Sequence, residues 1–243
     1  MSINVEEIQT LEREKKVNNS ENIDEKVNKQ SKKSIANILY VNFFKRVFDI
    51  LGGLIGIILM IPITLVIWIM NVVNHENGPI FYTQERIGKN GKTFKLFKYR
   101  SMVVGADEKL KKYLEEHPDA KEEYQTNKKL KEDPRITKTG AIIRKNSIDE
   151  WPQFINVLLG QMTLVGPRPY LPREKEDMGK YYDIIITMKP GLTGSWQVAG
   201  RSNLTFTDRL KLDEEYSKDN GFTTDLKILL KTISQVVKKD GAI

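Results

Sequence analysis

The sequence predicts a mainly α-helical protein with one small β-hairpin, held at a membrane by a proline-broken helix and by interfacial amphipathic helices. Three observations lead to this prediction. The stretch from Ile50 to Asn74 contains 25 residues and no charge. Asn90-Gly91 lies between two strand-like runs and is a strong hairpin signal. In residues 225–237 the apolar side chains recur at helical spacing, which favours a helix packed on the domain core or on the membrane surface.

The uncharged stretch is long enough to cross a bilayer, because 25 residues at about 1.5 Å each exceed a hydrocarbon core of roughly 30 Å. Pro62 lies in its middle, lacks an N–H donor and crowds the preceding turn, so the helix is expected to kink or break there. Two alternatives follow: a kinked span, or a re-entrant helix that returns to the side it entered.

Basic residues flank both ends of this stretch. Lys45 and Arg46 precede it, and six basic residues without an acid lie between Arg86 and Arg100. Since Lys and Arg prefer the cytoplasmic side, a re-entrant helix satisfies both flanks and a straight span does not. The Gly52-x-x-x-Gly56 spacing would also allow two helical arms, or two chains of a homodimer, to pack closely.

The chain is expected to have three parts. Residues 1–34 are polar and lack the apolar surface to fold, which predicts a disordered tail, either dispensable or regulatory. Residues 35–75 form an interfacial lead-in and the membrane helix. Residues 76–243 form a cytosolic, membrane-associated domain with a Lys- and Glu-rich helical insertion at about 106–132 and an extended Pro-rich loop at 160–172.

Composition restricts the chemistry that the chain can perform. It has no cysteine, which excludes disulfides, thiolate metal sites and cysteine nucleophiles. It has two histidines, so a multi-histidine metal site cannot be built. The net charge of +7 and the basic segment 86–100 indicate either a solvated face or contact with phosphates and anionic headgroups. Nucleic acid is not expected as a partner, because this segment follows the membrane helix directly.

Asp149 and Glu150 are the candidate catalytic carboxylates. One reading is structural: Ser147 and Glu150 have the spacing of a capping box, or Asp149 caps a helix that starts near Pro152. The other reading is that Asp149 is a nucleophile, since carboxylates form acyl-phosphate intermediates, with Arg144 holding a phosphate. The two carboxylates would then also bind Mg²⁺ together with the phosphate oxygens of the substrate.

Two further arginines are candidates for substrate binding. Prolines on both sides of Arg168 fix its backbone, and a guanidinium suits bidentate phosphate recognition, although a surface arginine would also fit this loop. Arg201 follows a segment of small residues with one tryptophan, which would suit close approach to a nucleotide or a plain turn.

Taken together, these motifs resemble the bacterial monotopic phosphoglycosyl transferases, the polyprenyl-phosphate sugar-1-phosphate transferases that initiate exopolysaccharide and O-antigen assembly. The matching segments cover about residues 43–243: KRVFDILGG, the proline-broken run, GPIFYTQERIGKNGKTFKLFKYRSM, DPRITKTG, IRKNSIDEWPQFINVLLGQMTLVGPRP, KPGLTGSWQVAGRS and the terminal GAI. Departures include isoleucine and tryptophan on either side of Asp149-Glu150, where leucine is usual, and Thr163 in place of serine.

The resemblance implies a reaction and roles for residues. Asp149 attacks the sugar-bearing phosphate of a UDP-sugar, UMP leaves, and undecaprenyl phosphate takes the phosphosugar from the enzyme. Mg²⁺ is the implied cofactor, bound at Asp149 and Glu150, while Arg144, Arg168 and, more weakly, Arg201 bind substrate. The insertion and the GAI end resemble the hexose-1-phosphate branch, which uses UDP-galactose or UDP-glucose.

The family also implies a re-entrant helix broken at a proline, matching Pro62, and a place on the cytoplasmic face of the inner or plasma membrane, in contact with its lipids. A non-enzymatic alternative is a membrane-anchored scaffold for polysaccharide assembly. Such a scaffold would explain the membrane helix and the charge, but not the motif spacing of Arg144, Asp149, Glu150 and Arg168.

Overall fold

The structure is a computed structural model that describes residues 37–127, 130–200 and 204–238. The described residues fall into two units, the first ending at Lys45 and the second beginning at Arg46. The tail predicted at 1–34 lies outside the described residues. In the first unit, residues 37–39 are helical and continue into a π-helix, η1 (Tyr40–Phe44), with Ile38, Phe43 and Phe44 exposed.

The apolar stretch that the sequence predicts to enter the membrane lies in α2 (Lys45–Val73), and this helix continues through Pro62. The predicted break at Pro62 is therefore wrong. Contacts on both sides of the proline hold the two halves in one helix: Met60 and Ile67 share a core cluster with Tyr99 and Ile143. Thr64 Oγ1 also donates a hydrogen bond to the Met60 carbonyl at 2.8 Å, within the turn that follows the proline. Among the described residues, α2 is the one helix long and apolar enough to cross a bilayer.

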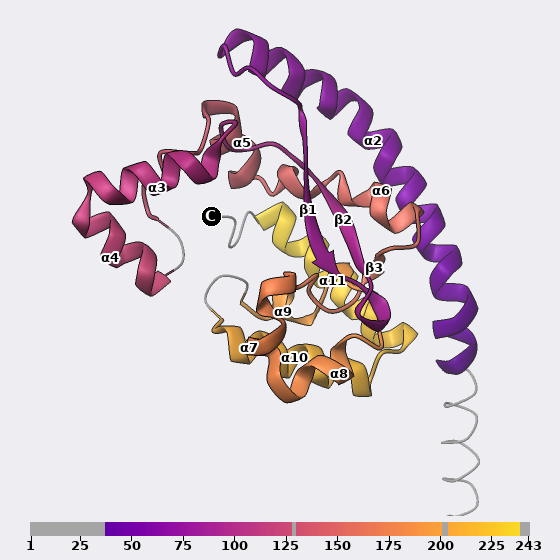
Figure 1. The fold of residues 1–243 in the computed structure, drawn as a ribbon. Helices are drawn as coiled ribbons and strands as arrows, with labels where there is room; N and C mark the ends of the chain where they lie inside the picture. Colours follow the sequence, from indigo (N-terminus) through magenta and orange to yellow (C-terminus); the bar gives the residue numbers. More distant parts are fainter. Residues whose placement is uncertain (1–36, 128–129, 201–203, 239–243) are drawn as a thin grey trace, which may run out of the picture. The chain divides into compact units, whose positions relative to one another are not determined.

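One stripe of α2 packs against the rest of the second unit (Figure 1). The stripe consists of Asp49, Gly53, Gly56, Met60, Ile67 and Asn71. Arg46 donates to the carbonyls of Val157 and Leu158, both at 2.8 Å, and Asp49 Oδ1 accepts from Thr163 Oγ1 and the Leu164 N–H. The opposite face exposes large apolar side chains, including Leu51, Ile55, Ile58, Leu65, Trp68 and Val73.

The predicted hairpin is present as β1 (Phe81–Ile87) and β2 (Thr93–Tyr99), which pair antiparallel. The turn contains η2 (Lys89–Gly91), in which Asn90 and Gly91 have φ of 59° and 74°. These left-handed values explain the Asn-Gly sequence. The hairpin packs against α6 and α2.

Helices follow the hairpin. Two of them, α3 (Ala106–Glu116) and α4 (Pro118–Asn127), lie within the segment for which a helical insertion was predicted, and the break falls at Pro118. The next elements are α5 (Lys138–Lys145), η3 (Ile148–Glu150) and α6 (Gln153–Leu158). Beyond them the chain forms η4 (Pro172–Glu174), α7 (Lys175–Met178), η5 (Gly179–Tyr181), α8 (Tyr182–Ile185), α9 (Ser195–Ala199), α10 (Phe206–Lys218) and α11 (Phe222–Lys238).

A second, parallel sheet was not predicted. It consists of β3 (Thr163–Val165) and β4 (Gly191–Thr193). Gly191 and Gly194 make this pairing possible, because a Cβ at either position would lie 2.1 Å from the backbone of Gly166. The two strands bring the Pro-rich loop after β3 and the helix α9 after β4 to the same end of the sheet.

The amphipathic helix α11 divides its apolar residues between two surroundings. Ile228 is buried in a core cluster with Val165 and Tyr216, and Leu229 packs against that cluster. Leu226, Leu230 and Ile233 are exposed. One side of the helix thus packs on the domain core, as one of the two alternatives predicts, and a separate apolar stripe faces outward. The other alternative, contact with the membrane surface, stays a prediction.

Candidate active site

Asp149 and Glu150 lie on η3, a single 3₁₀ turn between α5 and α6. Ser147 precedes this turn with a left-handed φ of 54° and makes no capping hydrogen bond with its side chain. Pro152, not Asp149, is the N-cap residue of α6. The capping alternatives for Ser147, Asp149 and Glu150 are therefore wrong, and both carboxylates remain available for other interactions.

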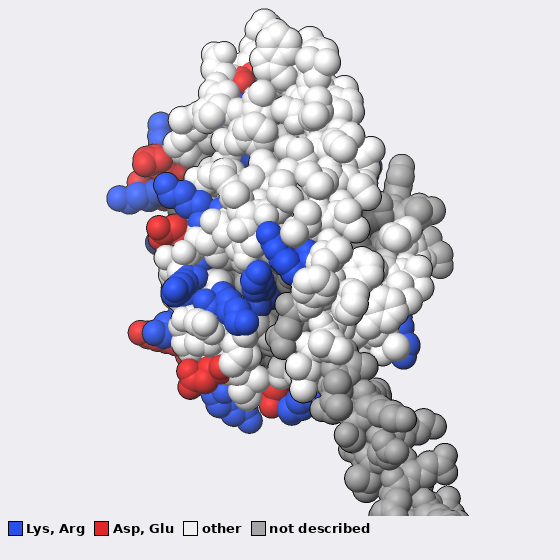
Figure 2. Space-filling model, turned by 90° about the vertical axis from the view of Figure 1, so that its right-hand side faces the viewer, with Lys and Arg blue, Asp and Glu red and all other residues white. Residues whose placement is uncertain are grey.

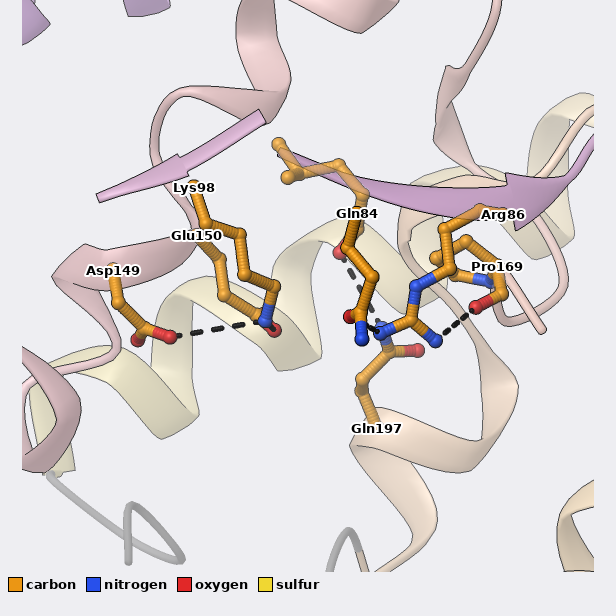
Figure 3. Close-up of polar contacts among 8 residues, drawn as sticks. Gln84, Arg86, Lys98, Asp149, Glu150, Pro169 and Gln197 are labelled. Atoms are coloured by element: carbon orange, nitrogen blue, oxygen red, sulfur yellow. Dashed lines mark hydrogen bonds and ion pairs between the residues drawn. The ribbon is translucent and has the colours of Figure 1, made fainter. Parts of the chain in front are cut away.

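Lys98 of β2 contacts both carboxylates (Figure 3). Its Nζ lies 2.9 Å from Glu150 Oε1 and 3.7 Å from Asp149 Oδ2. The side chains of Asp149 and Glu150 are 17% and 45% exposed, so the first carboxylate is much more enclosed than the second. The ammonium group therefore bridges two neighbouring carboxylates that differ in solvation.

The two carboxylates also differ in acidity. Burial raises the pKa of Asp149, while the charge of Lys98 opposes this shift and Glu150 adds to it. The pKa of Glu150 is lowered, chiefly by the charge and the hydrogen bond of Lys98 and also by Arg168 and Arg86. Asp149 is consequently the more basic carboxylate, which suits a nucleophile, and Glu150 is ionised more readily, which suits a ligand for a cation.

Arg86 of β1 lies on the same face of the hairpin as Lys98, because Arg86 pairs with Phe94, four residues before Lys98 on β2. Its guanidinium donates to the Pro169 carbonyl at 3.0 Å and to Gln84 Oε1 at 2.6 Å (Figure 3). Burial and the nearby Arg168 lower its pKa to about 10. Two mutually repelling guanidiniums are thus held close together, an arrangement that an anion would stabilise.

Arg168 lies in the Pro-rich loop after β3, and Asp213 of α10 fixes its backbone. The N–H of Arg168 and the hydroxyl of Tyr170 donate to Asp213 Oδ2 at 3.0 and 2.8 Å. Asp213 is fully buried. The Arg168 guanidinium lies 5.0 Å from the ring centroid of Trp196, which Arg209 also approaches. Arg168 is therefore held by its backbone and by its side chain.

These residues meet at one pocket between the hairpin, η3 and α9. Figure 3 shows the Asp149, Glu150 and Lys98 side on one flank and Gln84, Arg86 and Gln197 on the other. The pocket is lined by Arg86, Leu96, Lys98, Glu150, Gln153, Arg168, Pro169, Gly191, Leu192, Trp196 and Gln197. Glu150 thus shares a small cavity with Lys98, Arg86 and Arg168, and Asp149 lies beside that cavity, next to Lys98. This arrangement suits a phosphate group bound by the cations.

The structure brings together most of the residues selected from the sequence. Glu150 and Arg168 line the same pocket, and Arg144, in the last turn of α5, is close enough to Asp149 to lower its pKa electrostatically. Arg201 lies outside the described residues. The sequence places Lys98 and Arg86 in a basic segment but does not single them out as site residues. The register implied by the Asn90-Gly91 turn would have placed both on one face of the hairpin.

The donor set at η3 fits the implied Mg²⁺. Magnesium takes one or two carboxylates and completes its octahedron with water and substrate phosphate. Asp149 and Glu150 supply two carboxylates beside a pocket rich in arginine. Among the described residues no group of three His, Cys, Asp or Glu side chains offers a fuller metal cage.

Comparison with known proteins identifies the family of this chain. The family model described as "Bacterial sugar transferase" matches residues 40–239. A "UDP-galactose-lipid carrier transferase" of Erwinia amylovora is 44% identical over 200 residues, covering 82% of this chain and 42% of the relative. The "Exopolysaccharide production protein ExoY" of Sinorhizobium fredii is 38% identical over 199 residues, 82% of this chain and 87% of the relative.

A third relative names the acceptor. The "UDP-glucose:undecaprenyl-phosphate glucose-1-phosphate transferase" of Klebsiella pneumoniae is 36% identical over 199 residues, covering 78% of this chain and 39% of the relative. The chain thus spans about two fifths of the Erwinia and Klebsiella proteins and most of ExoY. Because the family model covers most of the sequence, including every candidate site residue, the chain belongs to the bacterial sugar transferase family.

Proposed function

We propose that this protein transfers a sugar 1-phosphate, galactose or glucose, from a UDP-sugar to undecaprenyl phosphate and releases UMP. This would be the first step in assembling an exopolysaccharide, capsule or O-antigen. The names of the relatives support the substrate classes. The observation that carries the proposal is the Asp149–Glu150 pair held by Lys98, with Glu150, Arg86 and Arg168 lining one pocket.

In the first step an Asp149 carboxylate oxygen attacks the phosphorus that bears the sugar. A new P–O bond forms to Asp149 while the P–O bond to UMP breaks, and UMP leaves with the bonding electron pair. Burial raises the pKa of Asp149 and makes it a less solvated, stronger nucleophile. Arg86 and Arg168 stabilise the charge that develops on the phosphoryl oxygens and on UMP.

In the second step a phosphate oxygen of undecaprenyl phosphate attacks the same phosphorus. The bond to Asp149 breaks, its carboxylate is regenerated, and the product is an undecaprenyl diphosphate sugar. Lys98, within 3.7 Å of Asp149, balances the charge of the returning carboxylate. Dividing the transfer in two allows a soluble donor and a membrane-bound acceptor to react at one site at different times.

Mg²⁺ bound by Asp149 and Glu150 would neutralise phosphate charge during both steps. The lowered pKa of Glu150 supports its role as a metal ligand, because the carboxylate stays ionised over a wide pH range. Lys98 holds the same two carboxylates in place.

We propose that the protein is monotopic and lies on the cytoplasmic face of the membrane. Hydrogen bonds near both ends of α2 support this proposal. Arg46 and Asp49, near the start of α2, bond to residues 157 and 163. Asn74 and Glu76, just after its end, bond to Thr139. If α2 crossed the bilayer, the polar residues bonded to both of its ends would be drawn into the hydrocarbon core, where unpaired polar groups are costly. Figure 2 shows a broad surface without charged residues on the side of α2, with Lys and Arg residues beside it, which suits lipid tails next to anionic headgroups.

The test is UMP release from a panel of UDP-sugars, with Mg²⁺ and undecaprenyl phosphate, using wild type and Asp149→Asn. We expect UMP from UDP-galactose or UDP-glucose with the wild type and none with the variant. No UMP from any donor, with folded protein bound to membrane, would instead support the scaffold alternative.

A further inference from the structure

Gln153 lines the pocket, and its side-chain amide makes no hydrogen bond to another residue that the structure describes. Gln153 is the first residue of α6, four positions after Asp149, and it is 3% exposed. It lines the pocket with Glu150 and Lys98. Gln153 is not among the side chains whose polar atoms are fully buried without a partner, so its amide keeps access to the pocket, where a ligand can reach it.

A neighbouring amide shows what a structural role looks like in this helix. Asn156, also buried, donates from Nδ2 to the Lys95 carbonyl and to Gln161 Oε1, both at 2.7 Å, and accepts from the Phe97 N–H at 2.9 Å. Asn156 thus binds α6 to β2 with every polar atom in use. Gln153, three residues earlier on the same helix, contributes no such bond.

Other unpartnered polar atoms gather around the same pocket. Gln197 Nε2 donates to the Leu192 carbonyl at 3.3 Å, but its Oε1 is buried without a partner. Arg168 Nε and Trp196 Nε1 are likewise buried and unpartnered among the described residues. All three side chains line the pocket with Gln153. The pocket therefore offers donors and acceptors that the protein itself does not use.

The chemistry of an amide indicates which part of a ligand it contacts. A phosphate oxygen only accepts hydrogen bonds, and Arg86, Lys98 and Arg168 already supply cations for it. An amide donates and accepts at once, as a sugar hydroxyl does, whereas its carbonyl oxygen would face a phosphate unfavourably. Resting on the proposed function, we propose that Gln153, together with Gln197 of the same pocket, binds the hydroxyl groups of the sugar carried by the nucleotide donor.

The experiment compares ligands with and without the sugar. Dissociation constants for UDP-galactose, UDP-glucose and UDP are measured with Mg²⁺ by titration calorimetry. The parent is the full chain with Asp149→Asn, which prevents the chemical step, and the variant adds Gln153→Met, which keeps the length of the side chain and removes its amide. The proposal predicts that the Kd of the better UDP-hexose rises about tenfold, while the Kd of UDP changes less than twofold.

Thermal stability provides a second readout, and Gln161→Met is the matched control. Gln161 accepts a hydrogen bond from Asn156, so its loss should lower the Tm without changing the preference for UDP-hexose over UDP. Gln153→Met should leave the Tm close to that of the parent, because the substitution breaks no hydrogen bond within the protein. Should Gln153→Met fail to fold, Gln153→Asn moves the amide by one carbon and should weaken UDP-hexose selectively.

Three results would overturn the inference: equal weakening of UDP and UDP-hexose, no weakening of either, or no measurable binding of any UDP-hexose to the parent. Release of UMP by the wild type, measured separately, shows whether the proposed function itself has failed. If the wild type releases UMP but Gln153→Met weakens UDP and UDP-hexose equally, only the role of Gln153 is refuted.

Discussion

The Nζ atom of Lys98 lies 2.9 Å from Oε1 of Glu150, which joins the β-hairpin to the 3₁₀ turn that carries the carboxylate pair. The hairpin packs against η3 and α6, so the position of Lys98 is set by strand pairing rather than by a flexible loop. The charge of Lys98 is also the largest cause of the lowered pKa of Glu150. This one contact therefore controls both the geometry and the ionisation of the candidate site.

Replacing Lys98 with Met should lower kcat/KM for UMP release by roughly 100-fold, the usual cost of losing one charged group at a phosphoryl or oxyanion site. The pKa of Glu150 should rise, which moves the acidic limb of the pH–rate profile to higher pH. Stability should change by less than about 1 kcal/mol, because the Glu150 side chain is 45% exposed and water screens its pairing with Lys98.

Lys112→Met is the matched control for this prediction, since Lys112 pairs with Glu116 at 3.8 Å on an exposed helix face. Its kcat/KM should stay within twofold of wild type. Full activity of the Lys98→Met protein would show that the bridge to Glu150 has no part in the reaction.

The packing of α2 on the domain depends on Gly56. A Cβ at this position would lie 2.3 Å from the ring of Phe154, whereas a Cβ at Gly53 would meet its nearest neighbour at an ordinary 3.5 Å. Gly56→Ala should therefore lower the free energy of unfolding by about 1–3 kcal/mol through overpacking, and Gly53→Ala should be close to neutral. Thermal unfolding of both variants in lipid nanodiscs tests this, and equal Tm values would contradict the packing described here.

Asp213 predicts a pH dependence of stability. Burial raises its pKa from 3.8 to about 7, opposed by its hydrogen bonds from Arg168 and Tyr170. Between these values the folded state keeps a proton that the unfolded state has lost, so this residue makes stability fall as pH rises from about 4 to 7. The shift corresponds to a contribution on the order of 4 kcal/mol, as an upper bound.

Asp213→Asn imitates the protonated carboxyl at every pH. Unfolding of wild type and variant at pH 5 and pH 8 should show a larger loss of stability for the wild type between the two values. Parallel changes in the two proteins would mean that Asp213 titrates with an ordinary pKa.

Local sequence signals were sufficient for several elements. Asn90-Gly91 predicted the hairpin because Asn and Gly readily adopt the left-handed conformation that a tight hairpin turn needs. The apolar spacing of 225–237 predicted α11. The pairing of β3 with β4 was missed because each strand has three residues and the contact depends on glycines 25 residues apart. The break expected at Pro62 failed for a related reason, since tertiary contacts of Met60 and Ile67 outweigh the local effect of proline.

The candidate site likewise contains residues that local sequence signals predict and residues whose roles depend on tertiary structure. Asp149, Glu150, Arg144 and Arg168 were selected from motif spacing, which survives in a linear sequence. Arg86, Lys98, Gln153 and Asp213 were not, because their roles depend on strand register, on burial and on a helix some 45 residues from the loop that it supports. Nothing local distinguishes a lysine that bridges two carboxylates from one that faces water.

The measurement that tests the central claim most directly is the intact-protein mass of the enzyme after incubation with its UDP-hexose and Mg²⁺, without undecaprenyl phosphate. If Asp149 is the nucleophile, wild type should gain the mass of one hexose phosphate, with UMP released in equal amount, and should lose that mass when the lipid phosphate is added. The Asp149→Asn protein should gain nothing. A wild-type enzyme that turns over donor and lipid but never carries the phosphosugar, or an Asp149→Asn protein that does carry it, would contradict the account.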